Sequence, residues 1–284
     1  MSREAIAAAF VAACREELEA PKPGNVHVFA PSRKGIDLFV RSAEVAAGPL
    51  TAPGTRTGAR ILGAVEATLA AVGTNTNLGI ILLCAPLALA AETGRAEIRA
   101  ALAEVLDALD LEDARLAFAA IDRAAPGGLG RVARNDVRAP ATVTLRHAMA
   151  EAAARDQIAC QYVTGFNAVF CLGLDAATAA QQRWRDAQPT TLCVFLAFLA
   201  AFADTHVVRE HGQAVAGEVR RDAVSLGERL TRADDWRDVL PEILAWDQSL
   251  KQRAINPGTS ADLTVATLFV RRLQNILPFV HNND

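Results

Sequence analysis

The sequence predicts an all-α fold, formed as one compact domain of many packed helices. Hydrophobic residues make up 51% of the chain, yet aromatic residues account for only 5%, so Ala, Leu and Val dominate. Ala and Leu are strong helix formers. No stretch of useful length alternates apolar with polar residues, and no Asn-Gly pair marks a hairpin. With 284 residues and no flexible linker, we expect a single domain over 1–284.

Helical periodicity extends over nearly every segment between stretches of Gly, Pro and Asn. The expected helices are 2–20, 36–48, 57–72, 78–91, 95–109, 111–124, 141–155, 157–173, 174–186, 190–203, 207–229, 235–250 and 260–276.

Sequence signals for helix ends support these assignments. The first helix stops at "PKPGN", and "GPLTAPGT" separates the second from the third. Asp110 is a good N-cap for the sixth, and "NPGTSAD" precedes the last. The longest irregular stretch, "APGGLGRVARNDVRAP", covers 125–140. We expect the loops rich in Gly and Asn to form the functional site.

Charge and cysteine content exclude several classes of protein. The net charge of −3 gives no basic surface for nucleic acid. The most apolar run, 78–91, is shorter than the roughly 20 residues of a membrane span, and the N-terminus lacks a signal peptide's layout. We therefore expect a cytoplasmic protein with no membrane or nucleic-acid partner. Five cysteines without a CxxC motif are best explained as buried free thiols in a reducing compartment: Cys14, Cys84, Cys160, Cys171 and Cys193.

The loop "GTNTNLG" (73–79) runs directly into the apolar helix. Asn75 or Thr76 is suited to cap that helix, and Gly73 and Gly79 permit close backbone approach. A helix N-terminus favours a phosphate or carboxylate because its N–H groups are unpaired. An ordinary capped helix start would explain the same residues.

The segment "EAPKPGNVHVF" (19–29) places Lys22 between two prolines, ahead of Gly24, Asn25 and His27. The prolines restrict the backbone and would hold the ammonium group with less loop entropy. The alternative is a turn that ends the helix and leaves a solvated lysine.

The loop "APGGLGRVARNDV" combines glycines, Gly128 among them, with Arg131 and Arg134, and Asp136 follows. Backbone N–H groups and arginine side chains of such a loop can bind phosphates. It matches neither the dinucleotide fingerprint nor the Walker loop.

The segment "ADTHVVREHG" (203–212) contains Asp204, His206, Arg209 and His211. The two histidines are five residues apart and do not match the HExxH zinc pattern. Asp204 could instead bind Mg²⁺, which prefers carboxylates together with phosphate oxygens. A polar helix face with local ion pairs is the competing interpretation.

Two further segments are polar at helix starts. "RDQIACQY" (155–162) brings Arg155 and Asp156 to the beginning of a helix. In "NPGTSADL" (256–263), Thr259 would cap the helix and Asp262 would reach back to it, so capping explains most of this motif.

In this order, the motifs resemble the triphosphoribosyl-dephospho-CoA synthase family. The matching pieces, from residue 22 to about 270, are "KPGNVH", "RSAEVAA", "GTNTNLGIILLCAPLALA", "PGGLGRV", "NDV", "RDQIACQYVTGF", "ADTHVVR" and "NPGTSADLTVATLF". The resemblance implies an all-α transferase in which ATP and 3′-dephospho-CoA give 2′-(5″-triphosphoribosyl)-3′-dephospho-CoA and adenine. It also implies ATP as a substrate, Mg²⁺ as the metal and a small-molecule acceptor.

By this resemblance, Lys22 and Arg131 neutralise phosphates, and the 73–79 loop seats an anion. Asp204 and Asp156 are candidates for metal binding or general-base catalysis, with His206 as a third catalytic candidate. The remaining substrate-binding candidates are Gly24, Asn25, His27, Ser42, Gly73, Asn75, Thr76, Asn77, Gly128, Arg155, Arg209 and Ser260.

The chain departs from the family at two adjacent positions. Synthases that serve citrate lyase and malonate decarboxylase typically carry a His-Lys pair where this chain has Asn77 and Leu78. The sequence is similar to a divergent branch in archaea and methylotrophs. Two alternatives follow: transfer to another acceptor in making a methanopterin- or methanofuran-type C1-carrier cofactor, or a non-catalytic nucleotide-binding helical protein. The broad apolar faces of the helices between 157 and 203 would bury within the domain or form a homodimer.

Overall fold

The computed structural model describes residues 1–30, 35–127, 130 and 135–276, and this part of the chain is helical with no strand. It contains α1 (Arg3–Leu18), α2 (Ile36–Leu50), α3 (Thr57–Val72), α4 (Leu78–Glu92), α5 (Ile98–Asp107), α6 (Leu111–Ala124), α7 (Leu145–Ala152), α8 (Gln157–Thr164), the π-helical η1 (Ala168–Gly173), α9 (Leu174–Trp184), α10 (Ala187–Ala201), α11 (Thr205–Arg232), the 3₁₀ turn η2 (Trp236–Val239), α12 (Leu240–Gln252) and α13 (Gly258–Ile276).

The predicted all-α fold class is confirmed, and most predicted helices lie where expected. Both α3 and α6 have the predicted bounds. Asp110 caps α6 by accepting hydrogen bonds from the backbone N–H groups of Glu112 and Asp113. The five cysteines are free thiols, as predicted, but only Cys14 and Cys84 are buried, whereas Cys160, Cys171 and Cys193 are half-buried.

One predicted helix, 157–173, is broken in the structure. Gly165 and Phe166 both take positive φ, 61° and 57°, so α8 ends at Thr164 and the chain resumes in η1. Phe166 is fully buried beside Tyr162, with 5.8 Å between the ring centroids. The packing of this ring outweighs the local preference for a continuous helix that the sequence pattern indicates.

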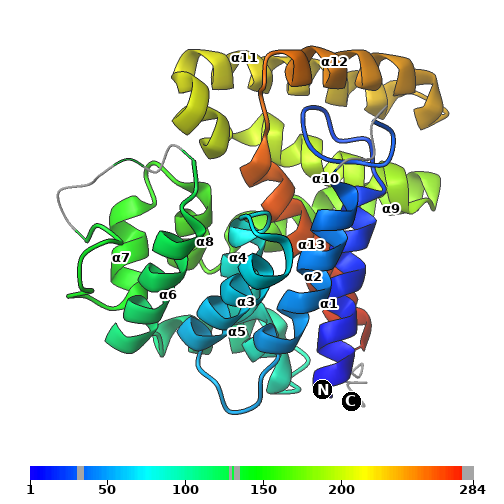
Figure 1. Ribbon diagram of the computed structural model, residues 1–284. Coiled ribbons are helices and arrows are strands. Elements are labelled where there is room, and N and C mark those ends of the chain that lie inside the picture. The colour runs from blue at the N-terminus through cyan, green and yellow to red at the C-terminus, as the bar shows by residue number, and fades with distance from the viewer. Residues whose placement is uncertain (31–34, 128–129, 131–134, 277–284) are drawn as a thin grey trace, which may run out of the picture.

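The helices pack around two buried ones, α4 and α13 (Figure 1). α13 packs against α1, α4 and α10, while α11 and α12 lie across the top of the molecule in this view. α6, α7 and α8 lie on the side opposite α1 and α2. α4 is apolar around its whole circumference, because neighbouring helices cover nearly all of it.

Two hydrophobic clusters form the core. The larger involves α1 to α10 and α13, and the smaller lies mainly among α10, α11 and α12. Helix α10 joins them, because Val194 and Phe198 belong to the first cluster and Phe195 and Leu199 to the second. The single domain over 1–284 stays a prediction.

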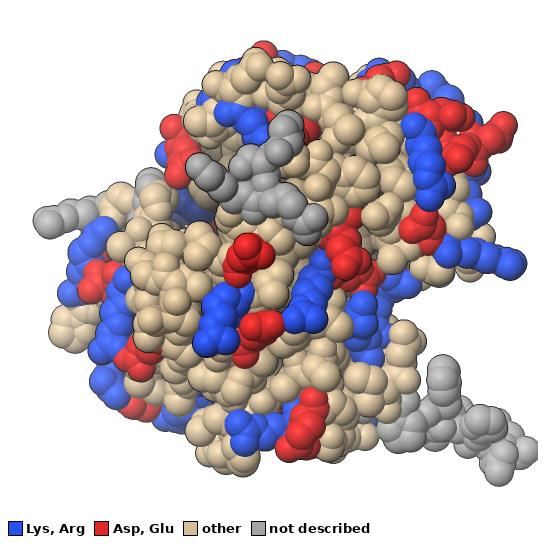
Figure 2. Space-filling view, turned by 45° about the vertical axis from the view of Figure 1, so that its right-hand side comes forward, with Lys and Arg blue, Asp and Glu red and all other residues tan. Residues whose placement is uncertain are grey.

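The described surface carries interspersed charges (Figure 2). Acidic and basic side chains alternate over the face shown, in keeping with a net charge of −3. Within the described residues, no helix alone has the length and apolar character to cross a membrane, although two sharply bent helix pairs do when each pair is taken together.

Candidate functional site

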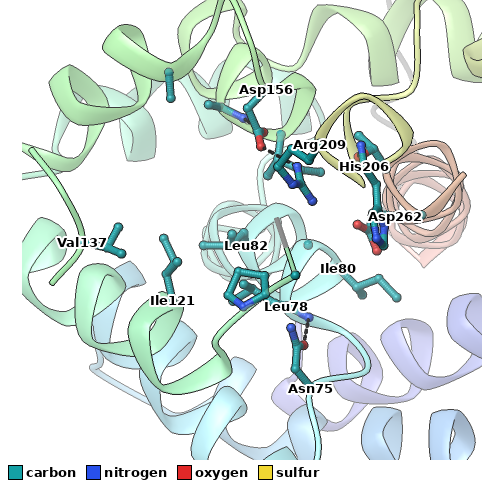
Figure 3. A pocket seen from close by; sticks show the side chains of 18 of the residues that line it. Asn75, Leu78, Ile80, Leu82, Ile121, Val137, Asp156, His206, Arg209 and Asp262 are labelled. Carbon is teal, nitrogen blue, oxygen red and sulfur yellow. Dashed lines mark hydrogen bonds and ion pairs between the residues drawn. The ribbon is translucent and has the colours of Figure 1, made fainter. Parts of the chain in front are cut away.

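A cavity of about 690 Å³ lies where several loops and helix starts meet. Its wall is formed by the 75–77 loop and the first turn of α4, by α6 and α7, and by the starts of α8, α11 and α13 (Figure 3). Segments that are far apart in sequence therefore meet at this cavity.

The cavity has one apolar wall and one polar wall. In Figure 3, Ile121, Val137 and Leu82 lie on one side, and Asp156, Arg209, His206 and Asp262 lie toward the other. Phe118, Leu145 and Met149 add to the apolar lining. Such a cavity suits a ligand with both a planar or apolar part and a strongly charged part.

Several helices begin at the cavity within the part of the chain that the structure describes. First-turn residues of α4, α8, α11 and α13 line it, for example Gly79, Ile158, His206 and Thr259. The N-terminus of a helix carries a partial positive charge and unpaired N–H groups, so these starts favour an anion.

Asp204 already occupies two of these helix starts. One carboxylate oxygen accepts hydrogen bonds from the backbone N–H groups of His206 (2.9 Å) and Val207 (3.2 Å), at the start of α11. The other accepts from the backbone N–H (2.7 Å) and hydroxyl (2.8 Å) of Ser260 in α13. Asp204 is 1% exposed and does not line the cavity. Its predicted metal-binding role, and substrate binding by Ser260, therefore find no support, because these groups bind each other.

Asp156, in contrast, lies at the cavity and pairs with Arg209. Asp156 caps α8 through the Ala159 N–H (3.0 Å), and its second oxygen lies 3.2 Å from the Arg209 guanidinium. The Arg209 Nε is buried and has no hydrogen-bond partner among the described residues, so it keeps donor capacity. Arg155 also lines the cavity and donates to the backbone oxygen of Glu151 (2.8 Å).

His206 forms a second charged pair at the cavity, with its Nε2 3.2 Å from the Glu210 carboxylate. Two glycines make room for this pair. A Cβ on Gly258 would lie 2.3 Å from the His206 ring, and one on Gly127 would lie 2.7 Å from the Glu210 carboxylate. Any larger residue would therefore displace one member of the pair.

Asp262 is the residue that the sequence interpretation assigned wrongly. It does not cap α13; its carboxylate lies at the cavity against Gly79 of α4 (Figure 3). Burial, reinforced by the negative charges of Asp204 and Glu17, raises its pKa well above the usual range. Thr259, predicted as the cap, instead accepts a hydrogen bond from the His206 N–H (3.1 Å). Asp262 follows Thr259 by three residues, which is the spacing of a capping box. The position of the Asp262 side chain at the cavity follows only from the packing of α13 on α4.

The 73–77 loop is partly placed as predicted. Asn75 accepts a hydrogen bond from the Leu78 N–H (3.1 Å), and both Asn75 and Asn77 line the cavity. Thr76 also lines it and donates to the buried Ser42 hydroxyl (2.7 Å), which lies behind the loop. Gly73 ends α3 with φ 73° and does not line the cavity.

The 20–29 loop contributes only Asn25 to the cavity lining. Lys22 is fully buried, and its ammonium donates to the Glu17 carboxylate (3.0 Å) and the Val26 carbonyl (2.6 Å). The alternative of a solvated lysine is wrong, and phosphate binding by Lys22 finds no support, because its charge is neutralised inside the protein. Burial lowers the pKa of Lys22.

Gly24 and His27 face α12 rather than the cavity. The Gly24 N–H donates to Asp247 (2.9 Å), and the His27 Nε2 lies 3.1 Å from the same carboxylate. Asn25, between them, donates to the Asn256 side chain (2.8 Å) at the cavity edge. Through these contacts, Gly24 and His27 fix the 20–29 loop against α12.

Gly128 and Arg131 lie outside the described residues. Among the residues described, no three His, Cys, Asp or Glu side chains form a group that could hold a metal ion. The carboxylates at the cavity fit Mg²⁺ in the form in which phosphate sites often use it, with one or two protein carboxylates and the substrate phosphates as ligands.

Comparison with known proteins identifies the family. The family model described as ATP:dephospho-CoA triphosphoribosyl transferase matches residues 3–279. The fold is similar to the crystal structure of a protein from Archaeoglobus fulgidus described as a candidate triphosphoribosyl-dephospho-CoA synthase. That match has a TM-score of 0.64 and 22% identity, and covers 84% of this chain and 99% of the other. No curated protein matches the sequence significantly. The chain therefore belongs to the ATP:dephospho-CoA triphosphoribosyl transferase family, whose members are transferases with ATP as a substrate.

Proposed function

We propose that the protein transfers the triphosphoribosyl group of ATP to the ribose hydroxyl of 3′-dephospho-CoA and releases adenine. The observation that carries the proposal is the cavity, where Arg155 and Arg209 and several helix starts face an apolar wall. A triphosphate needs cations and N–H donors, and a purine needs an apolar surface. This one cavity offers both kinds of group.

The polar wall would hold the triphosphate. Arg209 has an unpartnered Nε, and Arg155 lies at the start of the same wall. At the start of α4, the Leu78 N–H binds Asn75, which leaves the next N–H groups of that turn for a phosphate. Asp156 would hold Mg²⁺ together with the phosphates, and the ion would supply positive charge against them.

The carboxylates of the cavity suit a glycosidic transition state. When adenine leaves, the anomeric carbon gains positive charge, and carboxylates held in a dry site stabilise it. Glu17, Asp156 and Asp262 line the cavity. His206, held by Glu210 at 3.2 Å, would donate a proton to the departing adenine.

The first test is direct. Purified protein is incubated with ATP, Mg²⁺ and 3′-dephospho-CoA, and chromatography with mass spectrometry follows free adenine and the triphosphoribosylated product. We expect both products in equal amounts. ATP binding without adenine release would contradict the proposed reaction.

A change of acceptor is the second candidate function, favoured by Asn77 and Leu78 in place of the His-Lys pair. Asn77 is buried at the cavity and Leu78 is apolar, so neither supplies a charge there. In that case the acceptor would be a precursor of a C1-carrier cofactor, and adenine would be released only when a hydroxyl of that compound attacks ATP. Replacing dephospho-CoA by such a compound in the same assay separates the two functions.

A further inference from the structure

We propose that Asp262 is the general base that takes the proton from the attacking hydroxyl of the acceptor. This inference rests on the proposed function and names the catalytic residue of that reaction. Asp262 projects from the first turns of α13 into the cavity, beside the first turn of α4.

Asp262 differs from the other carboxylates of the cavity lining in having no hydrogen bond or ion pair to another described residue. Glu17 binds Lys22, Asp156 binds Arg209, and Glu210 binds His206. Asp136 binds Arg138, and Glu151 accepts a hydrogen bond from Asn135 (2.9 Å). A carboxylate that must accept a substrate proton cannot be held by a cation or a strong donor, and Asp262 meets this condition.

The space that Asp262 occupies depends on Gly79. A Cβ at Gly79 would lie only 2.0 Å from one oxygen of the Asp262 carboxylate. Gly79 does not have positive φ, so its backbone conformation would accept alanine. The glycine therefore provides room for the carboxylate. Without that room the side chain would have to move away from α4.

The surroundings of Asp262 give it the proton affinity that a base needs. Asp204, Glu17 and Asp156 place negative charge near it, Arg209 opposes them, and burial has the largest effect. The thiols of Cys14 in α1 and Cys84 in α4 also feel the negative charge of Asp262, and burial raises the pKa of both. Because its pKa is raised, the ionised Asp262 carboxylate takes up a proton more readily than an exposed aspartate does, as a general base must.

The proposed step is balanced in atoms and electrons. The acceptor oxygen forms a bond to the anomeric carbon as the bond from that carbon to the adenine nitrogen breaks. The hydroxyl proton passes to Asp262, and the electron pair of the broken bond leaves with adenine, which takes a proton from His206. Asp262 then returns its proton to solvent, and His206 regains one.

The test measures adenine release by the full-length protein over a range of pH. Asp262→Asn keeps the shape of the side chain and removes the base, so we expect kcat to fall by about 10²–10⁴-fold and its rising limb with pH to disappear. Asp262→Glu should restore part of the rate. Gly79→Ala keeps the carboxyl group but displaces it, so kcat should fall while the fold is retained.

Matched controls use groups remote from the cavity lining. Asp222→Asn removes an exposed carboxylate on α11, and Gly227→Ala adds a Cβ to open space in the same helix. Both should leave kcat unchanged. ATP binding in the presence of Mg²⁺, measured by calorimetry, should persist in all variants.

The outcomes separate the two proposals. If the wild type releases adenine and Asp262→Asn keeps the rate and the rising limb, Asp262 is not the base, although the proposed function stands. If the wild type releases no adenine with either acceptor class, both proposals are overturned. Loss of ATP binding in Asp262→Asn would overturn the base and assign the residue to substrate binding.

Discussion

The Asp262 carboxyl group lies at the cavity, where burial and neighbouring acidic residues raise its pKa in the folded protein. An unfolded chain would ionise the same group near pH 4. At pH values between the pKa of the unfolded chain and the higher pKa of the folded protein, folding therefore takes up a proton. The contribution of Asp262 to stability is greatest below about pH 4 and is lost as pH rises through its folded pKa.

Asp262→Asn should therefore stabilise the protein near neutral pH, because it removes an unfavourable charge. We expect a gain of about 1–2 kcal/mol in the free energy of unfolding at pH 8, with little gain at pH 4. Urea unfolding at both pH values measures it. Equal effects at the two pH values would contradict the raised pKa.

Burial also raises the pKa of Asp204, but hydrogen bonds from two helix starts oppose this effect and tie the carboxylate into the fold. Its four hydrogen bonds tie the start of α11 to the start of α13. Asp204→Ala would leave buried N–H groups at both helix starts without an acceptor. We expect the free energy of unfolding, measured with urea, to fall by about 2–4 kcal/mol.

Asp204→Asn refines this prediction. The amide would place an NH₂ group opposite at least one backbone donor, so most of the stability should still be lost. A folded, fully stable Asp204→Asn protein without activity would instead favour the catalytic role that the sequence suggested.

At the scale of elements, the 20–29 loop is held against α12 and the loop before α13. Gly24 has φ 80°, and a Cβ there would lie 2.7 Å from the Ile255 carbonyl and 2.8 Å from the ring of Pro257. Asp247 binds the Gly24 N–H, His27 and Lys251 at once. The loop thereby brings Asn25 to Asn256 at the cavity edge.

Gly24→Ala should disturb this contact for two reasons, a strained backbone and a collision with the neighbouring loop. We expect a loss of about 2 kcal/mol or more in stability, together with a raised KM for ATP. Gly54→Ala is the matched control, since Gly54 has φ 65° in open space. It should show the backbone strain without the collision, and hence a smaller loss and an unchanged KM.

At the scale of the whole molecule, α10 and α13 couple the two hydrophobic clusters. All three tryptophans, Trp184, Trp236 and Trp246, belong to the smaller cluster or pack against it. Tryptophan fluorescence therefore reports the α9–α12 layer, whereas far-ultraviolet circular dichroism reports helices throughout.

If the chain is one cooperative domain, the two signals should give coincident urea transitions. Saturating ATP with Mg²⁺ should raise both midpoints together. Binding at a hundredfold excess over Kd adds about 2.7 kcal/mol to the free energy of unfolding. Separate transitions would show that the α9–α12 layer unfolds independently and would contradict the single domain.

Much of the fold follows from local sequence. The bounds of α3 and α6 could be predicted because alanine-rich periodicity and the Asp110 cap act within a few residues. The break between α8 and η1 could not, because the burial of Phe166 depends on side chains distant in the sequence. The unusual composition of their loops predicts site roles for Asn75, Asp156 and Arg209, and all three residues line the cavity.

Local patterns in the amino-acid sequence suffice to predict the helical class, most helix positions and the loops that carry polar groups. Which of those groups face the cavity depends on how the helices pack. Asp204 and Asp262 are both carboxylates near helix starts, yet the first is bound by donors from two helices and the second faces the cavity beside Gly79. Capping is a local pattern that either residue could satisfy. Burial and pairing depend on how α4, α11 and α13 pack, which no local pattern specifies.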